Sequence, residues 1–166
     1  MQNYYHSIKQ HYLNSQGDST GLFEEILKAS NQVGMDEALA YLAQCVTEKR
    51  LAWLKANFDE AIHATDPLME GYRWFYERYL RVSVPGDGEI VEHTRKRIVM
   101  RWWNPCPTLE ACKKLGLDTR VVCKKAYHLP VQEFLEHIHP KLRFDRNYAS
   151  IRPHAAWCEE IIELED

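Results

Sequence analysis

The first half of the chain repeats apolar residues with the three-to-four-residue period of amphipathic helices. Residues 21–33 place their apolar side chains on one side, and Gly34 follows as a helix-ending residue. A longer apolar row begins after Asp36 and predicts a core helix. Asp66 followed by Pro67 is typical of a helix start, since aspartate caps the free N–H groups and proline fits the first turn. The pattern therefore predicts a mainly helical first half.

The helix predicted after Asp66 has an aromatic face. Its members are Met69, Tyr72, Phe75, Tyr76 and Tyr79. Such a stripe at helical spacing is typical of a hydrophobic core, and it also suits the wall of a ligand pocket. The sequence leaves both interpretations open.

The pattern changes in the second half, after the turn-forming residues 85–89. Residues 90–103 alternate apolar and mixed positions and predict a strand, and the shorter runs 142–148 and 157–164 suit strands that pair with it. Short helices are expected between them, at 109–115 with Thr108 as its cap, at 119–127 and at 131–137. These elements predict an α+β fold, with a helical N-terminal half and a small antiparallel sheet with short helices in the C-terminal half.

Length and composition are those of one ordinary domain, residues 1–166, in which residues 1–84 are mainly helical and residues 85–166 are α+β. The 166 residues are 45% hydrophobic, enough to build a core without disulfides. The net charge of −3 gives no general attraction to nucleic acid, and no apolar stretch is long enough for a membrane span. We expect a cytoplasmic protein with no membrane partner; a homo-oligomer is compatible with the sequence.

Basic residues concentrate in the second half. From Arg95 to Arg152 the chain has 13 Lys and Arg against 5 Asp and Glu. Most such charges simply face solvent, but an arginine fork can bind a carboxylate in a bidentate way. Arg101 and Arg152 are the candidates for binding a small carboxylate-bearing substrate.

The five cysteines carry most of the candidate chemistry. Their odd number favours free thiols or a metal site over a set of disulfides. Cys45 falls on the apolar face of a predicted helix and is expected in the core. Cys106 precedes a predicted helix start, where the positive helix end favours a reactive thiolate.

Two interpretations of the later cysteines remain open besides simple packing. Cys106 and His154 suit a nucleophile with an acid/base partner, since the ordinary pKa of histidine lies near neutrality. Alternatively, Cys106, Cys123, His154 and Cys158 supply three sulfurs and one imidazole, a donor set that suits tetrahedral zinc. No Cys-x-x-Cys pair is present, so each ligand would have to come from a separate element.

These residues also carry a resemblance to a protein family. Cys106 with Pro107, Cys123, Pro153 with His154, and Cys158 resemble the family of small bacterial proteins named after L-2-amino-thiazoline-4-carboxylate hydrolase. The resemblance covers roughly residues 90–164. It implies an α+β fold and hydrolysis of a C–N bond in a small sulfur-containing ring.

Three hypotheses about function follow. The first is a small-molecule hydrolase with Cys106, His154 and a carboxylate-binding arginine. The second is a non-catalytic sensor or accessory protein that binds a small ligand or metal through Cys and His. The third, a nucleic-acid-binding domain with Trp102, Trp103 and Trp157 as stacking platforms, ranks last because the net charge is negative.

Overall fold

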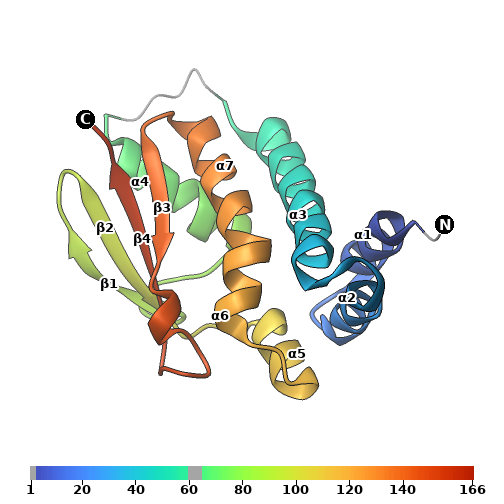
Figure 1. The fold of residues 1–166 in the computed structure, drawn as a ribbon. Coiled ribbons are helices and arrows are strands. Elements are labelled where there is room, and N and C mark those ends of the chain that lie inside the picture. Colours follow the sequence, from blue (N-terminus) through green and yellow to red (C-terminus); the bar gives the residue numbers. More distant parts are fainter. Residues whose placement is uncertain (1–2, 60–64) are drawn as a thin grey trace.

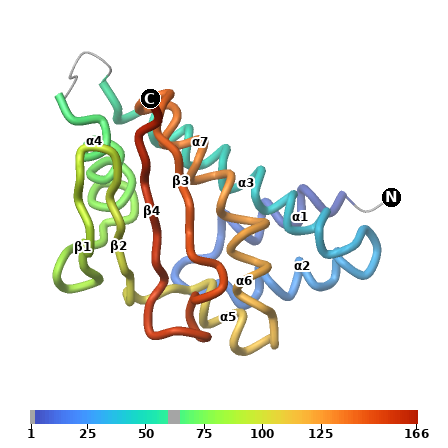
Figure 2. The backbone as a smooth tube through the Cα atoms, turned by 60° about the vertical axis from the view of Figure 1, so that its left-hand side comes forward, coloured from blue at the N-terminus to red at the C-terminus, as the bar shows by residue number. Residues whose placement is uncertain are grey.

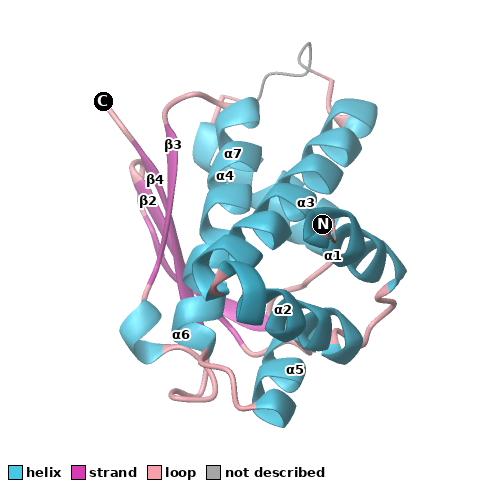
Figure 3. Ribbon diagram, turned by 45° about the vertical axis from the view of Figure 1, so that its right-hand side comes forward, coloured by secondary structure: helices cyan, strands magenta, loops and turns pink. Residues whose placement is uncertain are grey.

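A four-stranded sheet carries all the helices on one of its faces (Figures 1 and 3). The structure, a computed structural model, describes residues 3–59 and 65–166. Its α-helices are α1 (Tyr4–Asn14), α2 (Thr20–Val33), α3 (Met35–Asn57), α4 (Pro67–Tyr72), α5 (Pro107–Leu115), α6 (Thr119–Val122) and α7 (His128–Ile138). The strands are β1 (Gly88–His93), β2 (Arg97–Trp102), β3 (Leu142–Arg146) and β4 (Cys158–Leu164). The predicted α+β fold, helical first and with a small antiparallel sheet second, is confirmed.

The sheet has the order β1-β2-β4-β3, and every neighbouring pair is antiparallel (Figure 2). The single strand predicted over 90–103 is wrong in one respect, because the segment folds back as the β1–β2 hairpin. The backbone N–H of Thr94 donates to the carbonyl of Arg97, which closes the turn between the two strands. The two later predicted strands are confirmed as β3 and β4, with β4 between β2 and β3.

Helix α1 is absent from the predicted elements, because its sequence is polar and only Ile8 is fully buried. Hydrogen bonds and an ion pair to residues far away in the sequence hold α1 in place. Tyr5 donates to Glu48 on α3 at 2.7 Å, and Lys9 pairs with the same carboxylate at 2.9 Å. The predicted start of α4 is confirmed, since Asp66 accepts from the Met69 N–H and Pro67 occupies the first turn.

Buried side chains form two clusters, and the long helix α3 contributes to both. One cluster fills the space between the sheet, α4 and α7; the other lies among α1, α2, α3 and α5. Cys45 is 2% exposed in the second cluster, as predicted for a core thiol. None of the helices in the described ranges is long and apolar enough to cross a membrane.

Two segments have the wider π-helical form. The first, η1 (Arg73–Leu80), continues α4, and the second, η2 (Cys123–Tyr127), joins α6 to α7. A short 3-10 turn, η3 (Tyr148–Ser150), follows β3. π-Helical segments are rare and occur often at functional sites. Both of them supply side chains to the main cavity described next.

Candidate functional site

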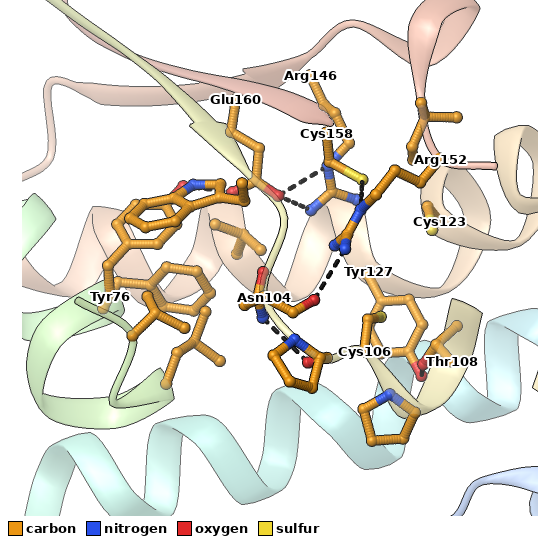
Figure 4. A pocket seen from close by; sticks show the side chains of 18 of the residues that line it. Tyr76, Asn104, Cys106, Thr108, Cys123, Tyr127, Arg146, Arg152, Cys158 and Glu160 are labelled. Carbon is orange, nitrogen blue, oxygen red and sulfur yellow. Dashed lines mark hydrogen bonds and ion pairs between the residues drawn. The ribbon is translucent and has the colours of Figure 1, made fainter. Parts of the chain in front are cut away.

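The main cavity lies between the inner face of the sheet, α3, and the start of α5, and has a volume of about 360 Å³ (Figure 4). That volume falls within the range of small-molecule sites. Apolar walls come from both π-helical segments, β2 and α7, including Phe75, Tyr76, Trp102 and Val131. The aromatic face predicted on the third helix therefore belongs to the core and also lines a pocket. Charged lining residues in the described chain are three arginines and one glutamate: Arg50, Arg146, Arg152 and Glu160.

Cys106 lies at the start of α5 and lines the cavity. It is itself the N-cap of α5, and its Sγ accepts the Leu109 N–H at 3.4 Å; the prediction that Thr108 caps this helix is wrong. Thr108 instead shares a 3.0 Å hydrogen bond with the hydroxyl of Tyr127. A thiol can replace the usual oxygen cap because its sulfur is a weak acceptor.

The sequence predicts a reactive thiolate at Cys106, but the surroundings of this residue raise the pKa of its thiol. Burial raises the pKa of this thiol, although the Leu109 N–H and the charge of Arg152 act in the opposite direction. The free-energy cost of removing the thiolate from water is larger than the stabilisation that the helix N–H and the guanidinium give to it. Cys106 is therefore a neutral thiol at neutral pH.

Two further thiols line the same cavity. Cys123 is at the start of η2, and burial raises its pKa to about 12. The Sγ of Cys158, at the start of β4, accepts from Nε of Arg152 at 3.4 Å. The structure thus brings Cys106, Cys123 and Cys158 to one hollow from three separate elements.

Arg152 reaches the cavity from the loop between η3 and β4 (Figure 4). Its Nη1 donates to the backbone carbonyl of Asn104 at 2.8 Å, and its Nε donates to Cys158. Its partners are thus a backbone carbonyl and a cysteine sulfur. Within residues 3–59 and 65–166, no carboxylate forms an ion pair with Arg152. Its positive charge therefore stands uncompensated at the cavity wall.

Arg146, Glu160 and Tyr76 form a buried network that the sequence did not single out. Glu160 accepts from Nε and Nη2 of Arg146 at 3.0 and 2.5 Å, and from the Tyr76 hydroxyl at 2.6 Å. Burial and the adjacent carboxylate raise the pKa of Tyr76 well above its ordinary value. Strand alternation places Glu160 on the inner face of β4, opposite Met100 of β2.

Arg50 is the second cavity residue that sequence reasoning missed. It lies on α3 and is 9% exposed, with its guanidinium carbon 5.1 Å from the ring of Phe75 and 6.0 Å from that of Tyr127. Its Nε and Nη1 donate to no group in the described part of the chain. A signal was present, because Arg50 follows Val46 by one helical turn inside an apolar row.

Two predicted site residues lie outside the cavity. Arg101 is on the outer face of the sheet, where its Nε bonds Glu159 at 2.9 Å and its guanidinium stacks on Trp157. Its neighbour Trp102 faces inward, so strand alternation directs Arg101 away. His154 is also not part of the cavity lining; its Nε2 lies 3.6 Å from Asp118, and its side chain is 38% exposed. The predicted pairing of Cys106 with His154 is therefore not formed.

The four-residue zinc set is not assembled. In the described residues, no group of three or more His, Cys, Asp or Glu side chains is placed to hold a metal ion. The three thiols share the cavity, whereas His154 turns toward Asp118 at the surface. Of the predicted stacking platforms, Trp102 is only 3% exposed and packs on Tyr76 at 5.0 Å between ring centroids. A buried ring of this kind cannot stack on a base.

Many of the basic residues between Arg95 and Arg152 have carboxylate partners. Arg97 and Arg101 pair with Glu163 and Glu159 of β4, and Arg143 pairs with Glu136 and Glu165. The local basic excess in the sequence is thus offset in part by the acids of residues 159–165, which follow it along the chain.

The chain matches no protein-family model, no curated protein and no solved structure. What can be said of its function therefore depends on the residues of the cavity.

Proposed function

We propose that the chain binds a small carboxylate-bearing molecule with an apolar body in the main cavity. The observation that carries the proposal is the position of Arg152, whose charge faces a largely apolar cavity and which, among the described residues, donates only to Asn104 and Cys158. An arginine in such surroundings binds a carboxylate strongly, because little water competes for its N–H groups.

The geometry of Arg152 also suits a bidentate partner. Its two hydrogen bonds use Nε and one position on Nη1, which leaves N–H groups on Nη1 and Nη2 for two carboxylate oxygens. Phe75, Tyr76 and Trp102 then provide the apolar surface for the rest of the ligand. Small-molecule sites are usually built in this way, with a few charged or polar groups that orient the ligand and apolar walls that contact the rest of it.

The test compares a carboxylate with its methyl ester, in which that one negative charge is removed. 2-Amino-thiazoline-4-carboxylate and its methyl ester are titrated into wild-type protein, Arg152→Gln and Arg101→Gln, with binding followed by calorimetry. We expect the acid to bind more tightly than the ester to wild type and to the Arg101 variant, which is altered on the outer face. Arg152→Gln should lose about 10- to 100-fold in affinity for the acid, as expected for a charged hydrogen-bonded pair. Equal binding of acid and ester by wild type would contradict carboxylate recognition.

Hydrolysis of a C–N bond in the bound molecule is a second candidate function, and the position of Cys106 favours it. Its sulfur lies in the same cavity as Arg152 and close enough for the guanidinium charge to affect its pKa. A carboxylate held by Arg152 would orient the ligand toward this thiol. With the ligand positioned by Arg152 next to the Cys106 thiol, this reaction does not require His154.

The reaction can be written with the neutral thiol as both nucleophile and proton source. The Cys106 sulfur forms a bond to the amidine carbon while its proton passes to the ring nitrogen. The bond between this carbon and the ring nitrogen then breaks, with a second proton passing from the exocyclic amino group to the ring nitrogen, which stays joined to the ring-opened molecule; a C=N bond to the exocyclic nitrogen forms at the carbon. Water attacks the same carbon, the C–S bond to Cys106 breaks, and the two protons of the water go to the exocyclic nitrogen and to the thiol, while its oxygen becomes the carbonyl.

Mass spectrometry separates this second candidate from binding alone. Wild-type protein incubated with 2-amino-thiazoline-4-carboxylate should show ring-opened product in solution, and Cys106→Ser should bind the acid but yield none. Product formation at the wild-type rate by Cys106→Ser would exclude the thiol as the nucleophile. Binding without any product in either protein would leave the cavity as a ligand site only.

A further inference from the structure

We infer that Arg50 forms a second anion-binding subsite in the main cavity, and that the ligand carries two acidic groups, one for Arg50 and one for Arg152. This inference rests on the proposed carboxylate site. It narrows the ligand class from a monoacid to a dicarboxylate, or a carboxylate with a second acid of another kind.

The first support is the state of the Arg50 side chain. It is more than nine-tenths buried, yet Nε and Nη1 have no acceptor among the described residues. A buried donor without a partner costs free energy that a folded protein rarely accepts without a reason. The rings of Phe75, Tyr79 and Tyr127 attract the cation through their faces, but ring faces do not replace in-plane hydrogen-bond acceptors.

The second support is the place of the guanidinium. Arg50 lines the cavity, and two of the rings that it packs on, Phe75 and Tyr127, line it as well. A ligand oxygen in the cavity can therefore approach the Arg50 guanidinium, although Nε and Nη1 themselves are covered by protein atoms and need a small movement of the side chain to bind it. Because Arg50 comes from α3 and Arg152 from the loop before β4, the two cations approach the cavity from different elements.

The third support is the charge balance of the lining. Three arginines face one glutamate, and that glutamate is already engaged by Arg146 and Tyr76. An excess of two positive charges remains on the described lining residues. A dianion neutralises this excess, whereas a monoanion leaves one buried cation uncompensated.

The experiment uses two acids that differ in one carboxylate. Phenylsuccinate has two carboxylates and an apolar ring, and 3-phenylbutanoate replaces one of those carboxylates with a methyl group. Calorimetric titrations are made with wild type, Arg50→Gln, Arg50→Lys and, as a control on the outer face, Arg101→Gln. Circular dichroism confirms that each variant is folded.

Wild type and Arg101→Gln should bind phenylsuccinate about 10- to 100-fold more tightly than 3-phenylbutanoate. Arg50→Gln should erase this preference, because its affinity for phenylsuccinate falls much more than its affinity for 3-phenylbutanoate. Arg50→Lys should keep part of the preference, because lysine retains the charge without the planar fork.

Three results would count against the inference or its foundation. Equal affinity of wild type for the two acids would overturn the second subsite and leave the carboxylate site at Arg152 standing. A preference that persists undiminished in folded Arg50 variants would place the second carboxylate elsewhere. Failure of both acids to bind wild type at millimolar concentration would refute the proposed carboxylate site as a whole. The wild-type comparison needs no variant, so the inference stays refutable even if both Arg50 variants fail to fold.

Discussion

Replacing Glu160 by glutamine should destabilise the protein far more than the same change at its neighbour Glu159. Glu160 is buried and accepts two hydrogen bonds from Arg146 and one from Tyr76. The substitution removes the negative charge while the Arg146 cation stays buried, in a cavity that already contains two arginines with no carboxylate partner among residues 3–59 and 65–166. Glu159 instead pairs with Arg101 on the outer face of the sheet.

The expected loss in free energy of unfolding follows from how deeply the Arg146–Glu160 and Arg101–Glu159 ion pairs are buried. Side chains of Arg146 and Glu160 are each 10% exposed, and removing one partner of such a pair costs about 3–5 kcal/mol. Glutamine keeps one acceptor oxygen, so we expect about 3 kcal/mol for Glu160→Gln. At this chain length that loss lowers the melting temperature by roughly 6–12 °C. The Arg101–Glu159 pair on the outer face is more exposed, with its side chains 33% and 22% exposed, and should contribute about 0–1 kcal/mol.

Urea and thermal denaturation followed by circular dichroism measure both variants. The double variant Arg146→Met, Glu160→Met should recover much of the lost stability, since it leaves no unpaired charge in the network. A loss for Glu160→Gln within about 1 kcal/mol of that for Glu159→Gln would refute the buried ion-pair network.

Three other predictions concern the thiols and the cavity wall. Burial raises the pKa of Cys123 to about 12 from an ordinary value near 9, so the thiol loses its proton at a lower pH in the unfolded state than in the folded state. The free energy of unfolding should therefore fall as pH rises from about 9 to about 12. Urea denaturation that gives the same free energy of unfolding across this range would contradict the prediction. Iodoacetamide at neutral pH should alkylate Cys106, which borders the cavity, faster than Cys45, which is 2% exposed in the helical core, and peptide mapping that shows equal rates would refute it. Gly88→Ala should weaken ligand binding as well as stability by about 1–3 kcal/mol, because a Cβ there would lie 2.4 Å from the ring of Trp102; an unchanged melting temperature would contradict that close approach.

Local patterns were sufficient for most of the fold. Apolar periodicity located α2 and α3, and the Asp66–Pro67 pair located the start of α4, because these signals act within one or two helical turns. Helix α1 escaped because its stabilising partner, Glu48, is distant in sequence. The β1–β2 turn escaped because the polar residues 92–97 that contain it include no Gly, Pro, Asn or Asp to mark a turn.

The site was predicted only in part, for a physical reason. Cys106 and Arg152 were selected by chemistry, and both line the cavity. Arg101 was selected by the same chemistry, but side chains alternate across a strand, and its neighbour Trp102 took the inward position. Which charged group faces a cavity depends on such register and on contacts between distant segments. Arg50 and Glu160 became recognisable only through those contacts.

A crystal structure of the protein in complex with phenylsuccinate would test the carboxylate site most directly. One carboxylate should lie in the main cavity within hydrogen-bond distance of Nη1 and Nη2 of Arg152, with the phenyl ring against the wall formed by Tyr76 and Trp102. Phenylsuccinate bound on the outer face of the sheet, or inside the cavity with no carboxylate on an arginine, would contradict the proposed function.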